Sequence, residues 1–330
     1  MYKRQSMSTY ALGSSVPITV AEAPFNDPDA DVVLCTADNV HFWVYKVLLS
    51  LASPVFKDMF RLPQPSQSQP GSTDESGRPI ISVAENRDTI EMMLRFCYPS
   101  VDSVTLDNLE DIQTMLAVMT KYDMQDGVTR VERQLAVPAF VVKEPLRVFA
   151  ISYRYRLADT ARLAMKASIR HLLTSGLDSS ELDHIPASGL SQYLKYRRRC
   201  VVEIARVIDF DSPSSIWSSF PWQGYDRCGC SIVSIGSYDW RSWFFDSVRS
   251  IVNALMNRPC PVLLKPTLWE SSLDKACGRC YAARHDFSEF VTKVLTPKVV
   301  KTISEVITIS CYLPMLSDIP HRSHWISSSE

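Results

Sequence analysis

Apolar residues in the first part of the chain follow a strand-like pattern and then a helix-like pattern. Two apolar, β-branched runs, Asp31–Cys35 and Val40–Val44, flank the turn residues Ala37–Asn39 and predict a β-hairpin. A helical stripe follows it, consisting of Leu48, Ala52, Val55, Phe56, Met59 and Phe60. Serine is a favoured N-cap and proline a favoured first helical residue, so Ser53-Pro54 predicts that one helix ends and another begins there.

The next elements complete a small α+β unit. Ile80–Val83 is predicted to be a third strand, after an exposed loop rich in Pro, Gln and Ser over Pro63–Pro79. Asp88 and Glu91 have the spacing of a capping box before another helical stripe, and Asp107 is a candidate cap for the helix after that. The first 125 residues or so therefore predict a small sheet covered by helices.

The pattern changes after this unit. Residues 126–208 are predicted to be nearly all helical, with helices opening at Pro145, at Asp159 and near Leu190. The segment Asp209–Asp239 is expected to be irregular and packed between tryptophans, and a helix is predicted over Trp243–Met256. A last helix pair begins near Asp286, with Pro297 expected to break it.

These patterns divide the chain into five parts. We expect a flexible leader (1–28), an α+β domain (29–125), a helical region (126–208), a mainly helical region with Cys and Trp (209–310) and a flexible tail (311–330).

Composition narrows the class of protein. The 35 Lys and Arg nearly balance the 36 Asp and Glu, so there is no global field that would attract nucleic acid or an anionic membrane, and neither is an expected partner. No run approaches the roughly 20 apolar residues that cross a bilayer. The nine cysteines, without an export signal, indicate reduced thiols in the cytoplasm, the nucleus or both. Because the common catalytic motifs are also missing, we do not expect an enzyme.

Two close pairs of cysteines are the candidate metal site. Cys228-x-Cys230 and Cys277-x-x-Cys280 offer four thiolates, and His285 is an alternative ligand. Soft sulfur ligands in close pairs are what tetrahedral zinc prefers, so a structural zinc ion is the candidate cofactor. The alternatives are buried free cysteines and, less favoured, a redox pair at Cys277 and Cys280.

A basic run lies in the helix predicted near Leu190. Lys195-Tyr-Arg-Arg-Arg199 could serve as a nuclear signal or a phosphate-facing patch. The simpler interpretation is the solvated face of an amphipathic helix.

Several separately spaced features resemble the BTB/POZ family. They are Asp31-Val-Val-Leu, Val44-Tyr-Lys-Val-Leu-Leu49, Ser53-Pro-Val-Phe56, Met59-Phe60 and Leu94-Arg-Phe-Cys-Tyr98. The family's usual histidine is Tyr45 here, at a structural position, so polar contacts of that histidine do not carry over. The helices after Gln125 stand where many such proteins have a BACK-like region, and the whole layout resembles fungal BTB proteins.

The resemblance implies a fold and a role. The fold is an N-terminal BTB/POZ domain followed by a mainly α-helical region. The role is a protein-interaction adaptor that forms homodimers and recruits a cullin scaffold of a ubiquitin ligase, with the C-terminal part binding the substrate. The alternative is a nuclear, transcription-associated regulator with a zinc-stabilised C-terminal region.

Overall fold

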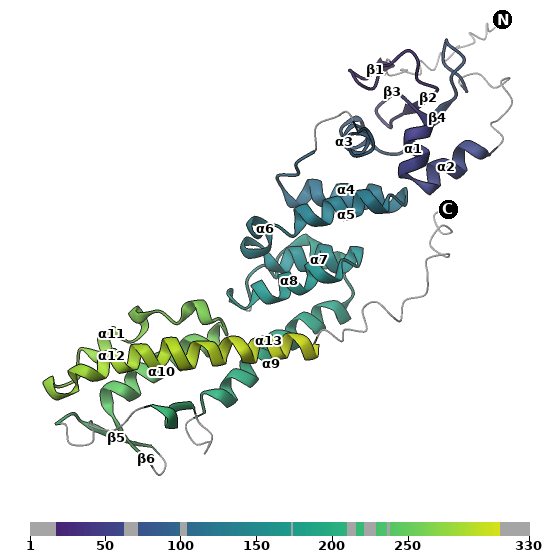
Figure 1. The fold of residues 1–330 in the computed structure, drawn as a ribbon. Coiled ribbons are helices and arrows are strands. Elements are labelled where there is room, and N and C mark those ends of the chain that lie inside the picture. Colours follow the sequence, from purple (N-terminus) through teal and green to yellow (C-terminus); the bar gives the residue numbers. More distant parts are fainter. Residues whose placement is uncertain are drawn as a thin grey trace, which may run out of the picture. The chain divides into compact units, whose positions relative to one another are not determined.

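The computed structural model describes residues 18–62, 72–99, 104–172, 174–209, 216–220, 229–235 and 238–310. The chain forms two compact units, residues 1–134 and 135–330. Figure 1 traces the order of their elements. The predicted α+β class is confirmed, with a small sheet in unit 1 and helices prevailing in unit 2.

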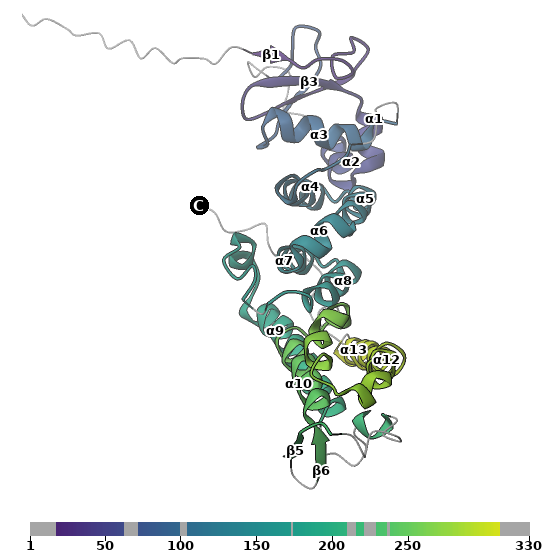
Figure 2. The ribbon, with the colours of Figure 1, turned by 90° about the vertical axis from the view of Figure 1, so that its left-hand side faces the viewer.

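Unit 1 is built on a four-stranded sheet in the order β1-β3-β2-β4. The central strands β2 (Val32–Cys35) and β3 (Val40–Val44) are antiparallel, as the hairpin prediction required. Strands β1 (Thr19–Val20) and β4 (Ile80–Ser82) pair in parallel at the two edges. In Figure 2, α3 and α4 lie on one side of this sheet.

The helices of unit 1 follow the predicted order. They are α1 (Lys46–Ala52), α2 (Pro54–Arg61), α3 (Arg87–Cys97), α4 (Leu109–Lys121) and α5 (Gln125–Leu135). The predicted break at Ser53-Pro54 is confirmed, since the Ser53 hydroxyl accepts from the Phe56 amide and Pro54 occupies the first turn of α2. The core between helices and sheet is apolar, with Leu34, Phe42 and Leu116 fully buried.

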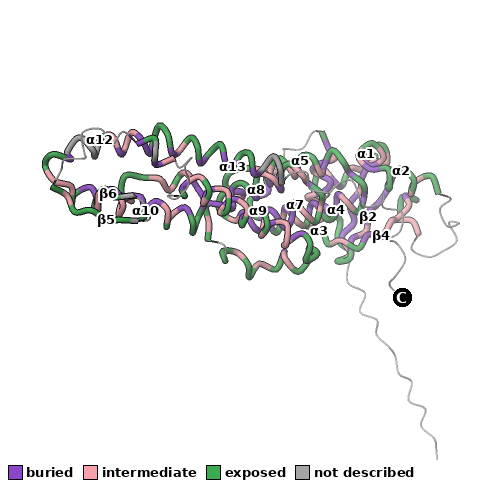
Figure 3. The backbone as a smooth tube through the Cα atoms, turned by 90° about the horizontal axis from the view of Figure 1, so that it is seen from below, coloured by how far each residue is buried: buried purple, intermediate pink, exposed green. Residues whose placement is uncertain are grey.

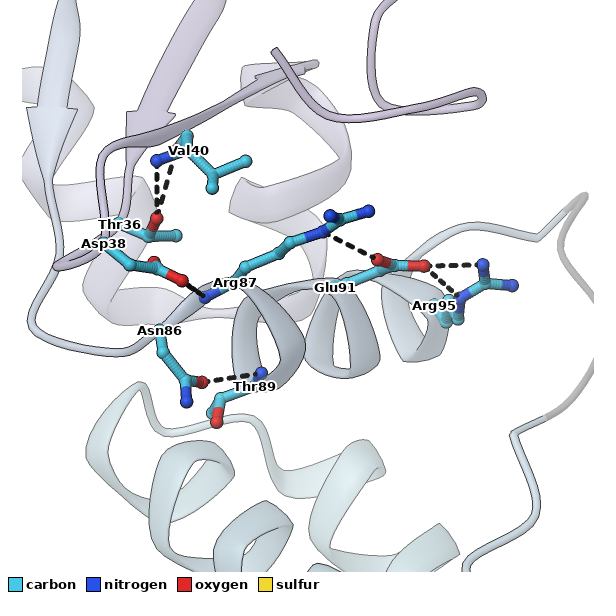
Figure 4. Close-up of polar contacts among 8 residues, drawn as sticks. All are labelled: Thr36, Asp38, Val40, Asn86, Arg87, Thr89, Glu91 and Arg95. Atoms are coloured by element: carbon cyan, nitrogen blue, oxygen red, sulfur yellow. Dashed lines mark hydrogen bonds and ion pairs between the residues drawn. The ribbon is translucent and has the colours of Figure 1, made fainter. Parts of the chain in front are cut away.

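Two predicted helix caps are wrong by one or two residues in the sequence. The side chain of Asn86, and not of Asp88, caps α3 by accepting from the Thr89 amide. Figure 4 shows that Asp38 also accepts from the Arg87 amide, so the turn of the hairpin fixes where this helix begins. Likewise α4 is capped by Asn108 and not by Asp107.

Residues 18–28, which we expected to belong to the flexible leader, are part of unit 1. Strand β1 pairs with β3, and the Phe25 side chain is buried edge-on against Tyr98, with 5.2 Å between ring centroids. The predicted tail, 311–330, lies outside the described residues.

Unit 2 is mainly helical. Its longer helices are α6 (Pro138–Lys143), α7 (Pro145–Tyr155), α8 (Ala158–Ser168), α9 (Ala187–Val207), α10 (Ser242–Asn257), α12 (Tyr281–Phe290) and α13 (Thr296–Ser310). Shorter elements are the 3-10 turns Ser180–His184, Ile216–Ser219, Pro261–Leu263, Pro266–Leu268 and Gly278–Cys280, and the helix α11 (Glu270–Leu273). Figure 3 shows buried and exposed turns alternating along α9, α10 and α13, as expected for amphipathic helices. The predicted regions 126–208 and 209–310 both contribute to this unit.

Two expectations for unit 2 are wrong. Part of the segment Asp209–Asp239, which was expected to be irregular, is regular: Ile232–Ile235 forms β5, which pairs with β6 (Tyr238–Arg241) in an antiparallel hairpin. Residues 210–215, 221–228 and 236–237 of the segment lie outside the described residues. Pro297 does not break the last helix, because a π-helical turn, Val291–Leu295, joins α12 to α13 just before it. A π turn already departs from the regular i to i−4 bonding that a proline disrupts.

Candidate functional site

The outward side of α1 and α2 exposes large apolar side chains. Leu49 and Phe56 point inward and are fully buried, and Phe56 stacks on Tyr122 with 4.5 Å between ring centroids. The opposite side carries Val47 (61% exposed), Leu51 (80%), Val55 (36%) and, just after α2, Leu62 (65%). We call these four residues the α1–α2 apolar surface.

Ser53 holds the two helices of this surface in place. Its side chain is completely buried, and its hydroxyl donates to the Tyr122 carbonyl at 2.5 Å while it accepts from the Phe56 amide at 3.1 Å. One hydroxyl therefore caps α2 and ties the corner between α1 and α2 to the end of α4.

A groove lies between α1, the end of α3 and α5. It has a volume of about 540 Å³ and is lined by Leu48, Leu51, Ala52, Phe96, Cys97, Pro99, Met124, Asp126, Gly127, Thr129, Arg130 and Arg133. Arg130 donates to the Phe96 carbonyl at 2.8 Å, and its guanidinium lies 4.9 Å from the Phe96 ring centroid. The lining of the groove thus combines apolar side chains from α1 and α3 with charged side chains from α5.

Sequence reasoning missed this groove. The residue spacing around Phe96 predicted where α3 ends. It gave no sign that Arg130, 34 residues further along the chain, lies beside Phe96. The only available signal was the helical periodicity of the following helices, which does not say which residues of α5 face α3.

Tyr45 makes polar contacts of its own. Its hydroxyl donates to Asp27 at 2.6 Å, and its backbone amide donates to the Tyr98 hydroxyl at 3.2 Å. The carboxylate partner raises the pKa of Tyr45 to about 12, and the same hydrogen bond lowers the pKa of Asp27. Tyr45 therefore joins the segment before β2 to the start of α1.

Three of the predicted metal ligands meet in unit 2. The ligand atoms of Cys230, Cys277 and Cys280 all lie within 4.8 Å of one another. The sulfur–sulfur distances are 3.8 Å between Cys230 and Cys280 and 3.7 Å between Cys277 and Cys280. Cys280 is fully buried, and the other two thiols are half-buried. We call these three residues the thiol cluster.

Of the other two predicted ligands, the structure describes only His285, which is not part of the thiol cluster. Cys228 lies outside the described residues. The side chain of His285 is 77% exposed and places its Nε2 3.6 Å from a Glu289 carboxylate oxygen. The cluster found among the described residues contains thiols alone.

Hydrogen bonds favour the ionised form of one cluster thiol. The contact with the Cys230 side chain is the largest cause, followed by backbone hydrogen bonds from Cys280 and Arg279, and together they lower the pKa of Cys277 to about 6. By contrast, burial raises the pKa of Cys97 to about 12 and that of Cys200 to about 11. Cys277 thus offers its sulfur in the form that binds metals, whereas Cys97 and Cys200 are held as thiols.

The basic run in α9 is not one continuous solvated face. Arg197 is only 3% exposed, and its guanidinium donates to the backbone carbonyls of His171 and Leu172. Tyr196 beside it is also buried, while Lys195 and Arg198 are exposed. Arg197, the middle residue of the run, therefore holds the chain after α8 in place. Its burial reduces the charge available for a phosphate-facing patch.

None of the helices described combines the length and the apolar character that crossing a bilayer requires.

Comparisons with known proteins identify the first unit. No curated protein matches the chain in a sequence search. A family model described as "BTB/POZ domain" matches residues 25–137, which include the sheet strands β2 to β4 and the helices α1 to α5. The match stops close to the end of unit 1, so the BACK-like assignment of the later helices and the fungal type stay predictions. Fold, spacing and family match agree, and residues 25–137 of this chain are a BTB/POZ domain.

Proposed function

We propose that the protein is an adaptor that self-associates through the α1–α2 apolar surface of its BTB/POZ domain. Domains of this family are protein-interaction modules, which fits a chain whose first unit is such a domain. The observation that carries the proposal is the exposure of Val47, Leu51 and Leu62, each at 61% or more. Removing apolar area from water is worth about 25 cal/mol per Å², so covering these side chains favours association.

A second copy of the chain is the partner that we assign to this surface. A two-fold dimer presents the same patch twice, so an apolar surface meets an apolar surface. A stable interface buries about 1,200–2,000 Å² in total, more than a few side chains provide. Strand β1 at the sheet edge adds Ile18 (66% exposed) and Val20 (43%) to the apolar area of this unit.

Replacing Leu51 tests the proposal directly. Leu51→Asp places a carboxylate in the proposed interface, while the 80% exposure of the side chain leaves the core of unit 1 intact. The full chain should sediment as a dimer or larger species at tens of micromolar, and the variant should shift towards monomer. The matched control is Leu163→Asp, the same change at a 47% exposed position on α8 of unit 2, which should leave the assembly unchanged.

Two results would contradict self-association through this surface. One is a wild-type chain that stays monomeric at these concentrations. The other is a Leu51→Asp variant that assembles as the wild type does.

The second part of the proposal is that the adaptor binds a cullin scaffold and presents a substrate through unit 2. We assign the scaffold to the groove between α1, α3 and α5. The apolar lining residues Leu48 and Phe96 suit the apolar stripe of a partner helix, and Arg133 on α5 offers a charge that can orient that helix.

Pull-down of the full chain with a cullin N-terminal region tests this part separately. The wild type should be retained, and Arg133→Glu should reduce retention because it reverses a charge at the groove. Lys57→Glu on the exposed side of α2 makes the same change outside the groove and should be retained as the wild type is. If no cullin N-terminal region retains the wild type, the scaffold role is wrong, while the self-association result stands on its own.

A further inference from the structure

We propose that Cys230, Cys277 and Cys280 bind a structural zinc ion that fastens the β5–β6 hairpin to the segment before α12. This site lies in unit 2, outside the BTB/POZ domain, and does not depend on the proposed adaptor function.

The distances between the sulfur atoms carry the proposal. In a tetrahedral site with Zn–S bonds of about 2.3 Å, neighbouring sulfurs lie about 3.8 Å apart. The pair Cys230–Cys280 is separated by 3.8 Å and the pair Cys277–Cys280 by 3.7 Å. A disulfide would need about 2.05 Å, so these cysteines are not bonded pairs, and their sulfur–sulfur distances match those between ligands of one zinc ion.

The backbone around the cluster supports charged sulfur. The amide of Cys277 donates to the Cys230 sulfur at 3.3 Å. The loop Cys277–Cys280 curls into a 3-10 turn, Gly278–Cys280, which brings its first and last thiols onto the same side. Amide donors aimed at thiolates stabilise the negative charge that a zinc site concentrates in a small volume.

The ligand chemistry selects zinc. Thiolates are soft ligands, and a site made of sulfur alone suits zinc far better than magnesium or calcium, which take oxygen ligands. Three protein thiolates leave one position of a tetrahedron. The sequence prediction gives that position to Cys228, two residues before Cys230.

The place of the cluster in the fold gives the metal a role. The chain from Cys260 to Cys280 consists of short 3-10 turns and the four-residue helix α11. The backbone hydrogen bonds of these turns join residues no more than four apart, so they do not tie the segment to the hairpin. Cys230 comes directly before the hairpin, 47 residues ahead of Cys277. A zinc ion across this gap closes a long loop and replaces contacts that regular structure does not supply there.

Metal analysis of the full chain, purified under reducing conditions, is the first test. The wild type should contain about one zinc ion per chain, and Cys277→Ser and Cys280→Ser should each reduce zinc at least about tenfold. Cys260→Ser is the matched control, because Cys260 is also buried in unit 2 but lies outside the cluster. It should keep its zinc. Folded wild-type protein without stoichiometric zinc, or folded cluster variants that retain it, would overturn the proposal.

A measurement on the unchanged chain covers the case in which the variants do not fold. Thiol alkylation followed by mass spectrometry should find the three cluster cysteines protected when zinc is bound and modified after a chelator is added. Cys35, half-buried in unit 1, should react equally in both samples. Equal alkylation of the cluster with and without chelator, or a disulfide between cluster cysteines in the reduced preparation, would refute a zinc site.

Discussion

Removal of one hydroxyl, in Ser53→Ala, should weaken the whole first unit. The alanine leaves the Phe56 amide without its cap and the Tyr122 carbonyl without its donor. Loss of an N-cap costs about 1 kcal/mol, and a buried polar group left unsatisfied costs about 1–3 kcal/mol. We therefore expect unit 1 to lose about 2–4 kcal/mol of its free energy of unfolding, while Pro54 still favours the start of α2.

Hydrogen exchange measures this loss for each unit separately. A loss of 2–4 kcal/mol accelerates exchange through unfolding by about 30- to 700-fold, since 1.4 kcal/mol is a factor of ten. The effect should be seen at the most protected amides of β2 and β3. Thr114→Ala is the control, because that exposed hydroxyl bonds only to a carbonyl of its own helix. If exchange in Ser53→Ala changes less than about twofold, the two hydrogen bonds do not stabilise unit 1 as argued.

Three further changes test other parts of the structure. Tyr45→Phe removes the main cause of the low pKa of Asp27, so an NMR titration should show a higher pKa for Asp27 in the variant. Ionised Asp27 stabilises the fold above its unfolded-state pKa, and this stabilisation is lost as pH falls through its folded-state pKa. The variant should therefore show a smaller stabilisation from Asp27. Arg197→Met should cost about 2–3 kcal/mol in thermal unfolding because two backbone carbonyls lose a buried donor, whereas Arg198→Met at an exposed position should change little. Cys228→Ser should lower zinc affinity at least about tenfold in a chelator competition, and unchanged affinity would show that the fourth ligand is another group.

Local rules were sufficient to predict the central hairpin of unit 1 and the corner between α1 and α2. The hairpin Val32–Val44 follows from strand residues around a turn, and the corner at Ser53 follows from capping preferences alone. The predicted helix cap was wrong where a tertiary contact determines which of several nearby residues caps the helix. Asn86 caps α3 in place of Asp88 because Asp38, from the hairpin turn, holds the adjacent Arg87 amide.

The hairpin of unit 2 could not be predicted in this way. An isolated two-stranded hairpin is marginal in water, so β5 and β6 depend on what packs against them. The Trp240 ring stacks on Phe244, four residues further along in the first turn of α10, with 5.5 Å between centroids, so the helix that follows supports the hairpin. Cysteine spacing suggested that Cys230 and Cys277 belong together, but the three-dimensional approach of the two segments needed the structure.

The π-helical turn at Val291–Leu295 joins two helices that pack against different neighbours within unit 2. Before it, Phe287 of α12 packs against aromatic rings from α10 and its neighbours, including Trp243 and Phe244. After it, α13 runs along α9. Each π turn holds one residue more than an α turn, which rotates everything downstream by about 100°. Deleting a single residue here would restore regular α-helical hydrogen bonds, but it would turn the apolar side of either α12 or α13 towards water.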